Sequence, residues 1–206
     1  MIGTTSMPAT AFEGSTRIAS GALRDVAVAV KAVNDRGTTQ PVLIFDDVTS
    51  HPIELDLRGT LAEVLARLAP DDAVEAPPAA PQPELPRGPG RPKLGVVPRE
   101  ITLLPRHWEW LGKQPGGASV ALRKLVEEAK KQNEAKDRAR TAQESAYRFM
   151  STLAGNQPGF EEATRAFFAN NAERFEQLTQ YWPPDVREHA LVLASRAFGA
   201  MRYKVV

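Results

Sequence analysis

Positively charged side chains are the residues of this 206-residue chain whose type and spacing could do chemistry, and they gather in its middle third. Residues 81–140 carry 13 Lys and Arg against 7 Asp and Glu, whereas residues 1–80 carry 6 against 11 and residues 141–206 carry 7 against 7. A basic segment of this kind favours a polyanionic partner such as nucleic acid. The alternative is that the helices of this segment carry Lys and Arg on faces that simply meet water.

Residues for catalysis or cofactor binding are sparse. The chain has no cysteine, which excludes disulfides, thiolate metal ligands and cysteine nucleophiles. His51, His107 and His189 lie far apart and lack the spacing of metal ligands. No phosphate-binding loop, dinucleotide fingerprint or nucleophile elbow occurs. The sequence therefore predicts a protein without catalytic activity and indicates no cofactor and no small-molecule ligand.

Four carboxylates surround one expected hairpin, namely Asp46, Asp47, Glu54 and Asp56. Carboxylates at a strand end can hold Mg²⁺. More often such residues are solvated turn residues or the polar face of an edge strand. We therefore predict no metal site.

The hydropathy pattern contains no membrane-spanning segment. No apolar run approaches the roughly 18–20 residues that a span needs. The first residues lack a basic region followed by an apolar core, so no secretory signal is expected. Together with the absence of cysteine, which fits a reducing compartment, this predicts a cytoplasmic protein without a membrane partner.

Residues 9–69 predict a small α+β domain. Gly14-Ser15 is typical of a hairpin turn, and the apolar residues that follow recur at helical spacing until Asp35-Arg36-Gly37. Farther along the chain, Ile53, Leu55 and Leu57 alternate with two acidic residues, as in a strand with one apolar face. Thr60 and Glu63 have the spacing of a capping box. The expected elements are strands at 10–13, 16–20, 42–45 and 53–57 and helices at 22–36 and from Thr60 to Leu68.

The following residues, 70–97, predict a proline-rich basic linker. Ten of the 17 prolines lie between residues 70 and 105. Proline at this density prevents helices and central strands, so an extended, semi-rigid segment is expected.

Beyond the linker, residues 98–137 predict a central module and residues 138–200 a C-terminal helical bundle. Ser119 to Ala154 contains neither Gly nor Pro and is either one long helix or two helices joined near Lys130–Arg140. Three short amphipathic helices follow, at 160–169, 172–182 and 185–198, and the aromatic residues there are mostly core candidates. The expected fold is thus α+β and mostly helical.

The central module combines an alternating run, a helix that begins with proline, a Gly-Gly turn and a second amphipathic helix. In the run 99–104, Ile101 and Leu103 share one face, which is expected to face the helices. Pro105 suits a helix start because its missing N–H is not needed there. The apolar faces of the two helices are expected to consist of Trp108 and Leu111 in the first and Leu122, Leu125, Val126 and Ala129 in the second.

The segment Gly117-Ala118-Ser119-Val120-Ala121-Leu122-Arg123-Lys124-Leu125-Val126 resembles the second-helix signature of ribbon-helix-helix repressors. This resemblance implies a homodimer whose strands pair as an antiparallel ribbon in a DNA major groove. It also implies that the N–H groups at Gly117, Ala118 and Ser119 anchor a phosphate. The other residues expected to contact DNA in this module are Arg99, Thr102 and Arg106, with Thr102 as the base contact.

Two strand residues depart from the repressor pattern. The groove-facing positions would be Glu100, Thr102 and Leu104, and a glutamate repels phosphate while a leucine reads little beyond a thymine methyl. The sequence therefore predicts a homodimeric DNA-binding protein of the transcription-regulator kind that contacts mainly phosphates. One alternative is a dimerisation or protein-interaction module that does not bind DNA. For the fold of the module, the alternative is a plain helical hairpin preceded by an extended arm.

Upstream, Pro86-Arg87-Gly88-Pro89-Gly90-Arg91-Pro92-Lys93 resembles an AT-hook, whose Gly-Arg-Pro core lies in the minor groove of A·T-rich DNA. The resemblance implies DNA contacts from Arg87, Arg91 and Lys93. The usual basic residue before the core glycine is replaced by Pro89, and a solvated linker is the alternative.

Nearly the whole chain is similar to a bacterial family catalogued as domain of unknown function 2239. This resemblance implies no activity. The segments that carry it are Thr10-Ala11-Phe12, Ile18-Ala19-Ser20-Gly21, Leu55-Asp56-Leu57-Arg58-Gly59, Gly90-Arg91-Pro92-Lys93-Leu94-Gly95-Val96 and Leu104-Pro105-Arg106-His107-Trp108-Glu109-Trp110-Leu111.

Overall fold

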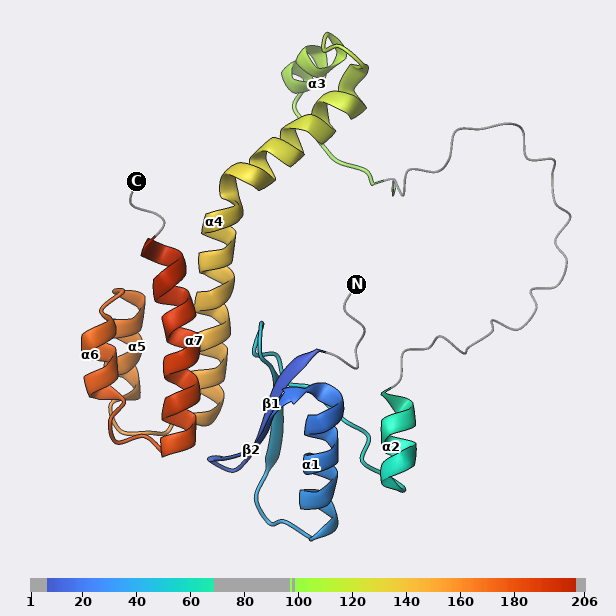
Figure 1. Ribbon diagram of the computed structural model, residues 1–206. Coiled ribbons are helices and arrows are strands. Elements are labelled where there is room, and N and C mark those ends of the chain that lie inside the picture. Colours follow the sequence, from blue (N-terminus) through green and yellow to red (C-terminus); the bar gives the residue numbers. More distant parts are fainter. Residues whose placement is uncertain (1–6, 69–96, 98, 203–206) are drawn as a thin grey trace, which may run out of the picture. The chain divides into compact units, whose positions relative to one another are not determined.

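The computed structural model describes residues 7–68, 97 and 99–202, with side chains up to residue 200 (Figure 1). The chain divides into two compact units. Unit 1 comprises residues 1–72 and 134–206, and unit 2 comprises residues 73–133. Most of the predicted linker, including Arg87, Arg91 and Lys93, lies outside the described residues.

Unit 1 contains a three-stranded antiparallel sheet with strand order β2-β1-β3. The strands are β1 (Pro8–Glu13), β2 (Thr16–Ala22) and β3 (Val42–Asp46). Gly14 joins β1 to β2 at φ +59°, a left-handed conformation that favours glycine. The predicted hairpin and the predicted strand at 42–45 are therefore confirmed.

The central strand β1 is buried on both faces. Ala9 and Ala11 belong to an apolar cluster with α1 (Leu23–Asp35), whereas Phe12 belongs to a second cluster with the C-terminal helices. Because successive side chains of a strand point to opposite faces, β1 serves two cores at once. α1 lies against one face of the sheet, as Figure 1 shows, and its predicted range is confirmed within one residue at each end.

The C-terminal part of unit 1 is helical. It consists of the end of α4 (Gly117–Leu153) and of three further helices. α5 and α6 lie side by side next to α7 (Figure 1). Phe167, Phe175 and Trp182 are buried as expected, but Phe168 and Tyr181 are 51% and 79% exposed, so their assignment to the core was wrong. The three helices are α5 (Phe160–Phe168), α6 (Ala172–Leu178) and α7 (Pro184–Arg202).

The turn after β3 is tied to the C-terminal helices by polar contacts. Ser50 has a left-handed φ of 52°, and its buried hydroxyl is 2.8 Å from the hydroxyl of Ser145 on α4. Arg148 of α4 donates to the carbonyl oxygen of Thr49, and Arg196 of α7 donates to that of Asp47 at 2.6 Å. These contacts join segments about a hundred or more residues apart in the sequence.

The strand expected at residues 53–57 does not form. Only a bridge between Phe45 and Pro52 and one hydrogen bond, from the Ile53 N–H to the Ile44 carbonyl at 2.8 Å, link this segment to β3. The alternation itself was read correctly, because Ile53, Leu55 and Leu57 pack on the α1 cluster. Side-chain burial therefore holds the segment without a regular ladder of backbone hydrogen bonds.

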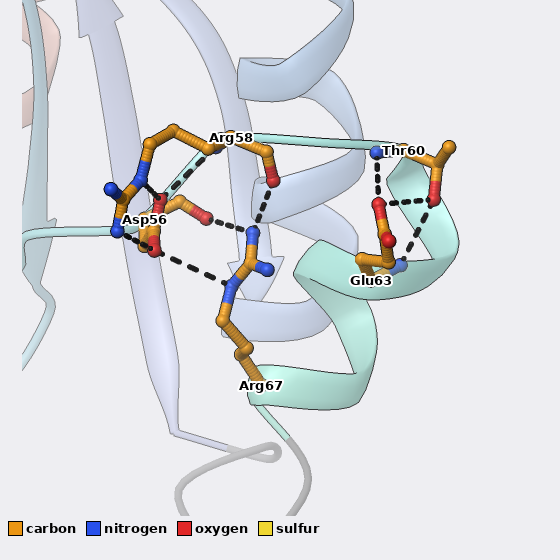
Figure 2. A network of polar contacts seen from close by, with 5 residues as sticks. All are labelled: Asp56, Arg58, Thr60, Glu63 and Arg67. Carbon is orange, nitrogen blue, oxygen red and sulfur yellow. Dashed lines mark hydrogen bonds and ion pairs between the residues drawn. The ribbon is translucent and has the colours of Figure 1, made fainter.

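A polar network fixes the chain around α2 (Leu61–Arg67), as Figure 2 shows. The Thr60 hydroxyl accepts from the Glu63 N–H, and Glu63 accepts in return from the Thr60 N–H at 2.7 Å, which confirms the predicted capping box. The Arg58 guanidinium donates two hydrogen bonds of 2.8 Å to the Asp56 carboxylate, and Arg67 donates to the Asp56 carbonyl. The Arg58 guanidinium holds the pKa of Asp56 well below its usual range.

Three of the four carboxylates considered as metal ligands engage different partners. Asp46 accepts from the N–H groups of Val48 and Thr49, which closes the turn. Asp47 accepts from Thr10, whereas Asp56 pairs with Arg58. Within the described ranges, no three His, Asp or Glu side chains cluster as a metal site would need.

Candidate nucleic-acid interface

Unit 2 is built around a helical hairpin. α3 (Pro105–Gly112) begins with proline at its first turn, as predicted, after an extended Leu104 that offers no side-chain cap. α4 starts at Gly117 and is one continuous helix to Leu153, and the boundary between the two units falls within it, between residues 133 and 134.

Two glycines make the turn between these helices. Gly116 and Gly117 have φ values of +84° and +77°, which side-chain-bearing residues rarely adopt. A Cβ on Gly116 would also lie 3.2 Å from the side chain of Val120. The Gly117 N–H donates to the Gln114 carbonyl at 2.9 Å, which closes the turn.

The interior of this hairpin is small. Among the described residues of unit 2, only Leu111 and Ala121 are buried apolar side chains, at 3% and 7% exposure. Beside them lies an apolar groove of about 280 Å³ between the two helices. The groove is lined by Leu103, His107, Trp110, Leu111, Leu122 and Leu125.

Large apolar side chains around this groove face outward. Trp108, predicted to be buried, is 43% exposed, and Leu125 and Val126 of the predicted apolar stripe are 44% and 61% exposed. Ile101, expected to face the helices, is 51% exposed, while Leu103 is half-buried. The single chain therefore leaves most of the predicted apolar face uncovered.

The segment from Arg99 to Leu104 has no regular secondary structure, although the sequence predicted a strand there. A strand needs a neighbour to accept and donate its backbone hydrogen bonds. In the proposed ribbon this neighbour would belong to a second chain. In the single chain the prediction is thus not met.

The polar residues predicted to contact DNA are spread over unit 2. Arg99, Thr102 and Arg106 are exposed before and at the start of α3, whereas Gly117, Ala118 and Ser119 form the start of α4. In the described part of the chain no hydrogen bond or ion pair joins the first group to the second. The structure therefore presents two separate groups of candidate contacts within unit 2.

A seventh residue, Arg123, lies at the start of α4 and was not among the predicted contacts. Its Nε donates to the Ser119 carbonyl at 3.1 Å, and its Nη2 is 3.5 Å from the Ser119 hydroxyl. The four-residue spacing on a helix could have revealed this pair. The first N–H groups of a helix have no partner within it and form the positive end of its dipole, so Arg123 adds positive charge there. The Gly117 N–H, which was predicted to anchor a phosphate, is already engaged by the Gln114 carbonyl, so the N–H groups of Ala118 and Ser119 are the remaining candidates for that contact.

The described residues 99–133 carry seven Lys and Arg against four Asp and Glu.

No helix within the described ranges is long and apolar enough to cross a membrane.

Together these features define a mostly helical α+β protein with a small N-terminal antiparallel sheet and a basic helical hairpin in a separate unit. The model of the family described as "Uncharacterized protein conserved in bacteria (DUF2239)" matches residues 8–194, and the chain belongs to this family. Neither a curated protein nor a solved structure matches the chain.

Proposed function

We propose that the chain is a homodimeric DNA-binding protein that holds DNA mainly through phosphates, in the manner of a transcriptional regulator. The observation that carries the proposal is the basic helical hairpin of unit 2, whose apolar face is exposed in the single chain. The arm residues Arg87, Arg91 and Lys93 enter the proposal on their sequence alone.

The dimer is supported by the size of the hairpin and by its surface. Domains below about 40 residues rarely bury enough apolar area to fold without disulfides, a metal or a partner chain. The hairpin has two buried apolar residues, but its tryptophans are about half-exposed, with Trp110 at 51%. Contiguous exposed apolar surface of this kind marks an interaction site. A second hairpin would cover it and would bring two 99–104 segments together for pairing.

DNA as the partner is supported by charge and by the start of α4. Phosphate contacts supply most of the non-specific affinity of such proteins and position them on the duplex. The α4 N-terminus with Arg123, and the exposed Arg99 and Arg106, are suited to such contacts. Glu100 and Leu104 are poor readers of base edges, so Thr102 is the expected base contact.

The dimer is tested by placing charge on the apolar face. Leu125→Glu with Val126→Glu is expected to convert the dimer to a monomer in sedimentation velocity, because two carboxylates would be buried unpaired in the interface. Gln132→Glu, an exposed position on the same helix, is the control and is expected to leave the dimer intact. A wild-type chain that stays monomeric at high micromolar concentration would contradict the proposal.

DNA binding is tested by duplex affinity as a function of salt concentration. Affinity is expected to fall steeply with added salt, with a logarithmic slope of about 0.9 for each phosphate neutralised. Arg106→Ala with Arg123→Ala is expected to weaken binding and to reduce this slope by roughly two, without changing the oligomer. Arg165→Ala with Arg174→Ala, which removes two exposed arginines of unit 1, is the matched control.

A dimer that binds no duplex even at low salt would favour the second candidate, a dimeric protein-interaction module. The acidic Glu100 in the 99–104 segment is the observation that keeps this candidate open.

A further inference from the structure

A histidine lies in the core of unit 1 with no role in the proposed interface. His189 of α7 is 7% exposed. Its ring centroid is 4.5 Å from that of Phe149 on α4 and 5.7 Å from that of Phe12 on β1. The imidazole therefore sits where the sheet, α4 and α7 meet.

One nitrogen of this imidazole lacks a partner. His189 Nε2 is buried and has no hydrogen bond within the described part of the chain. A buried polar atom without a partner is costly, and a buried charge without a partner costs far more. The two phenyl rings attract a cation only weakly compared with the water that burial removes.

Charged groups of both signs surround the ring. Asp47, in the turn after β3, and Glu188 of α7 favour the protonated imidazole, whereas Arg196 of α7 and Arg17 of β2 disfavour it. Both carboxylates are already engaged. Asp47 accepts from the Thr10 hydroxyl at 2.6 Å, and Glu188 pairs with Arg17 at 3.1 Å. Arg148 of α4 also faces this turn, through its hydrogen bond to Thr49.

We propose that His189 is a pH-sensitive latch that holds α7 and the end of α4 against the sheet while it is neutral and loosens this packing when it is protonated. The proposal is independent of DNA binding, because every residue that it uses belongs to unit 1.

The direction of the effect follows from burial. Burial is the largest cause that lowers the pKa of His189, and the attraction of Asp47 opposes it without reversing it. In the opened or unfolded chain the imidazole has its ordinary pKa of about 6.5. Stability from the neutral form is therefore complete above that pH and is lost as the pH falls from there toward the lower pKa of the folded state.

The test follows the unfolding of unit 1 between pH 7.5 and 5.5, above the range in which most carboxylates titrate. In a full-length chain with Trp108→Phe and Trp110→Phe, fluorescence reports Trp182, which is buried in the same core. The unfolding equilibrium constant is expected to rise toward low pH, by at most about tenfold per pH unit. In His189→Phe this rise is expected to disappear, whereas the exposed His51→Gln is expected to keep it.

A direct titration keeps the proposal falsifiable if His189→Phe fails to fold. The NMR signal of the His189 ring in the wild-type chain is expected to titrate below the ordinary histidine value of about 6.5, because burial lowers its pKa. A midpoint at the ordinary histidine value, or an unfolding constant that is unchanged by His189→Phe at every pH, would overturn the latch.

Discussion

In unit 1, Phe12, Phe149 and Phe167 have no exposed surface, whereas in unit 2 Ile101, Trp108 and Val126 are 51%, 43% and 61% exposed. Both units draw on the same residue types and both contain long stretches of helix. The difference lies in what each unit can cover with its own residues. In unit 1, α1 and the C-terminal helices both pack on the sheet, whereas unit 2 has one hairpin.

This contrast distinguishes a unit that is stabilised by internal packing from a unit whose apolar surface is open to binding. A unit that buries its apolar side chains internally gains its stability from within the chain. A unit that leaves its apolar side chains on the surface gains a comparable stabilisation only when a bound partner covers them. Unit 1 is thus the part of the molecule whose apolar side chains are covered by its own residues, and unit 2 is the part for which we propose a partner.

The largest expected effect comes from truncating the aromatic centre of unit 1. Phe149→Ala removes a fully buried ring that contacts Phe12, Phe45 and His189, and it is expected to lower the free energy of unfolding of unit 1 by about 3–5 kcal/mol. Trp110→Ala in unit 2 removes a larger ring that is half-exposed and is expected to change the same quantity by less than about 0.5 kcal/mol.

Denaturant titration monitored by hydrogen exchange of unit 1 amides measures both variants. Equal destabilisation of unit 1 by the two substitutions would show that the units are not energetically distinct, and the comparison would fail.

An intermediate effect is expected at the buried hydroxyl pair. Ser145→Ala leaves the Ser50 hydroxyl, which is fully buried, without its partner. Such a group costs about 1–3 kcal/mol, so the free energy of unfolding of unit 1 is expected to fall by this amount. The exposed Ser151→Ala on the same helix is the control in urea titrations. A Ser145→Ala chain as stable as this control would contradict the assigned role of the pair.

The smallest effect is expected at helix starts. Thr60→Ala removes the capping box of α2 and is expected to cost about 0.5–2 kcal/mol of local stability, seen as faster hydrogen exchange at the Val64 N–H. In unit 2, α3 has no side-chain cap at Leu104. Leu104→Thr is therefore expected to slow exchange in α3, and unchanged exchange in both variants would remove this difference between the units.

Local sequence signals predicted much of this structure. The hairpin at Gly14, the cap at Thr60 and the proline start of α3 were all predicted, because each depends on a few neighbouring residues. The segment at 53–57 shows the limit of such signals. Its alternation fixes which side chains are buried, but it does not decide whether a neighbouring strand follows it closely enough to form a ladder.

Contacts between residues that are far apart in the sequence were harder to predict from local sequence patterns. Nothing near Phe12 or Phe45 indicates that both pack on Phe149 rather than inside a separate N-terminal domain. Local sequence likewise does not indicate that the Ser50 hydroxyl pairs with that of Ser145, 95 residues away. In the candidate interface, the exposed positions of Arg99 and Arg106 fit the sequence prediction, but whether they contact DNA is a matter for the salt titration.

The composition of unit 1 from residues 1–72 and 134–206 has a consequence for how the protein is made. Phe12 leaves the ribosome 137 residues before Phe149, the ring it packs against. At synthesis rates of about 5–20 residues per second, this is a delay of roughly 7–27 s. Once β3 has also been synthesised, the sheet has one apolar face whose covering helices are not yet made. We therefore expect a chain that is truncated before α4 to expose this apolar face and to aggregate more readily than the full chain.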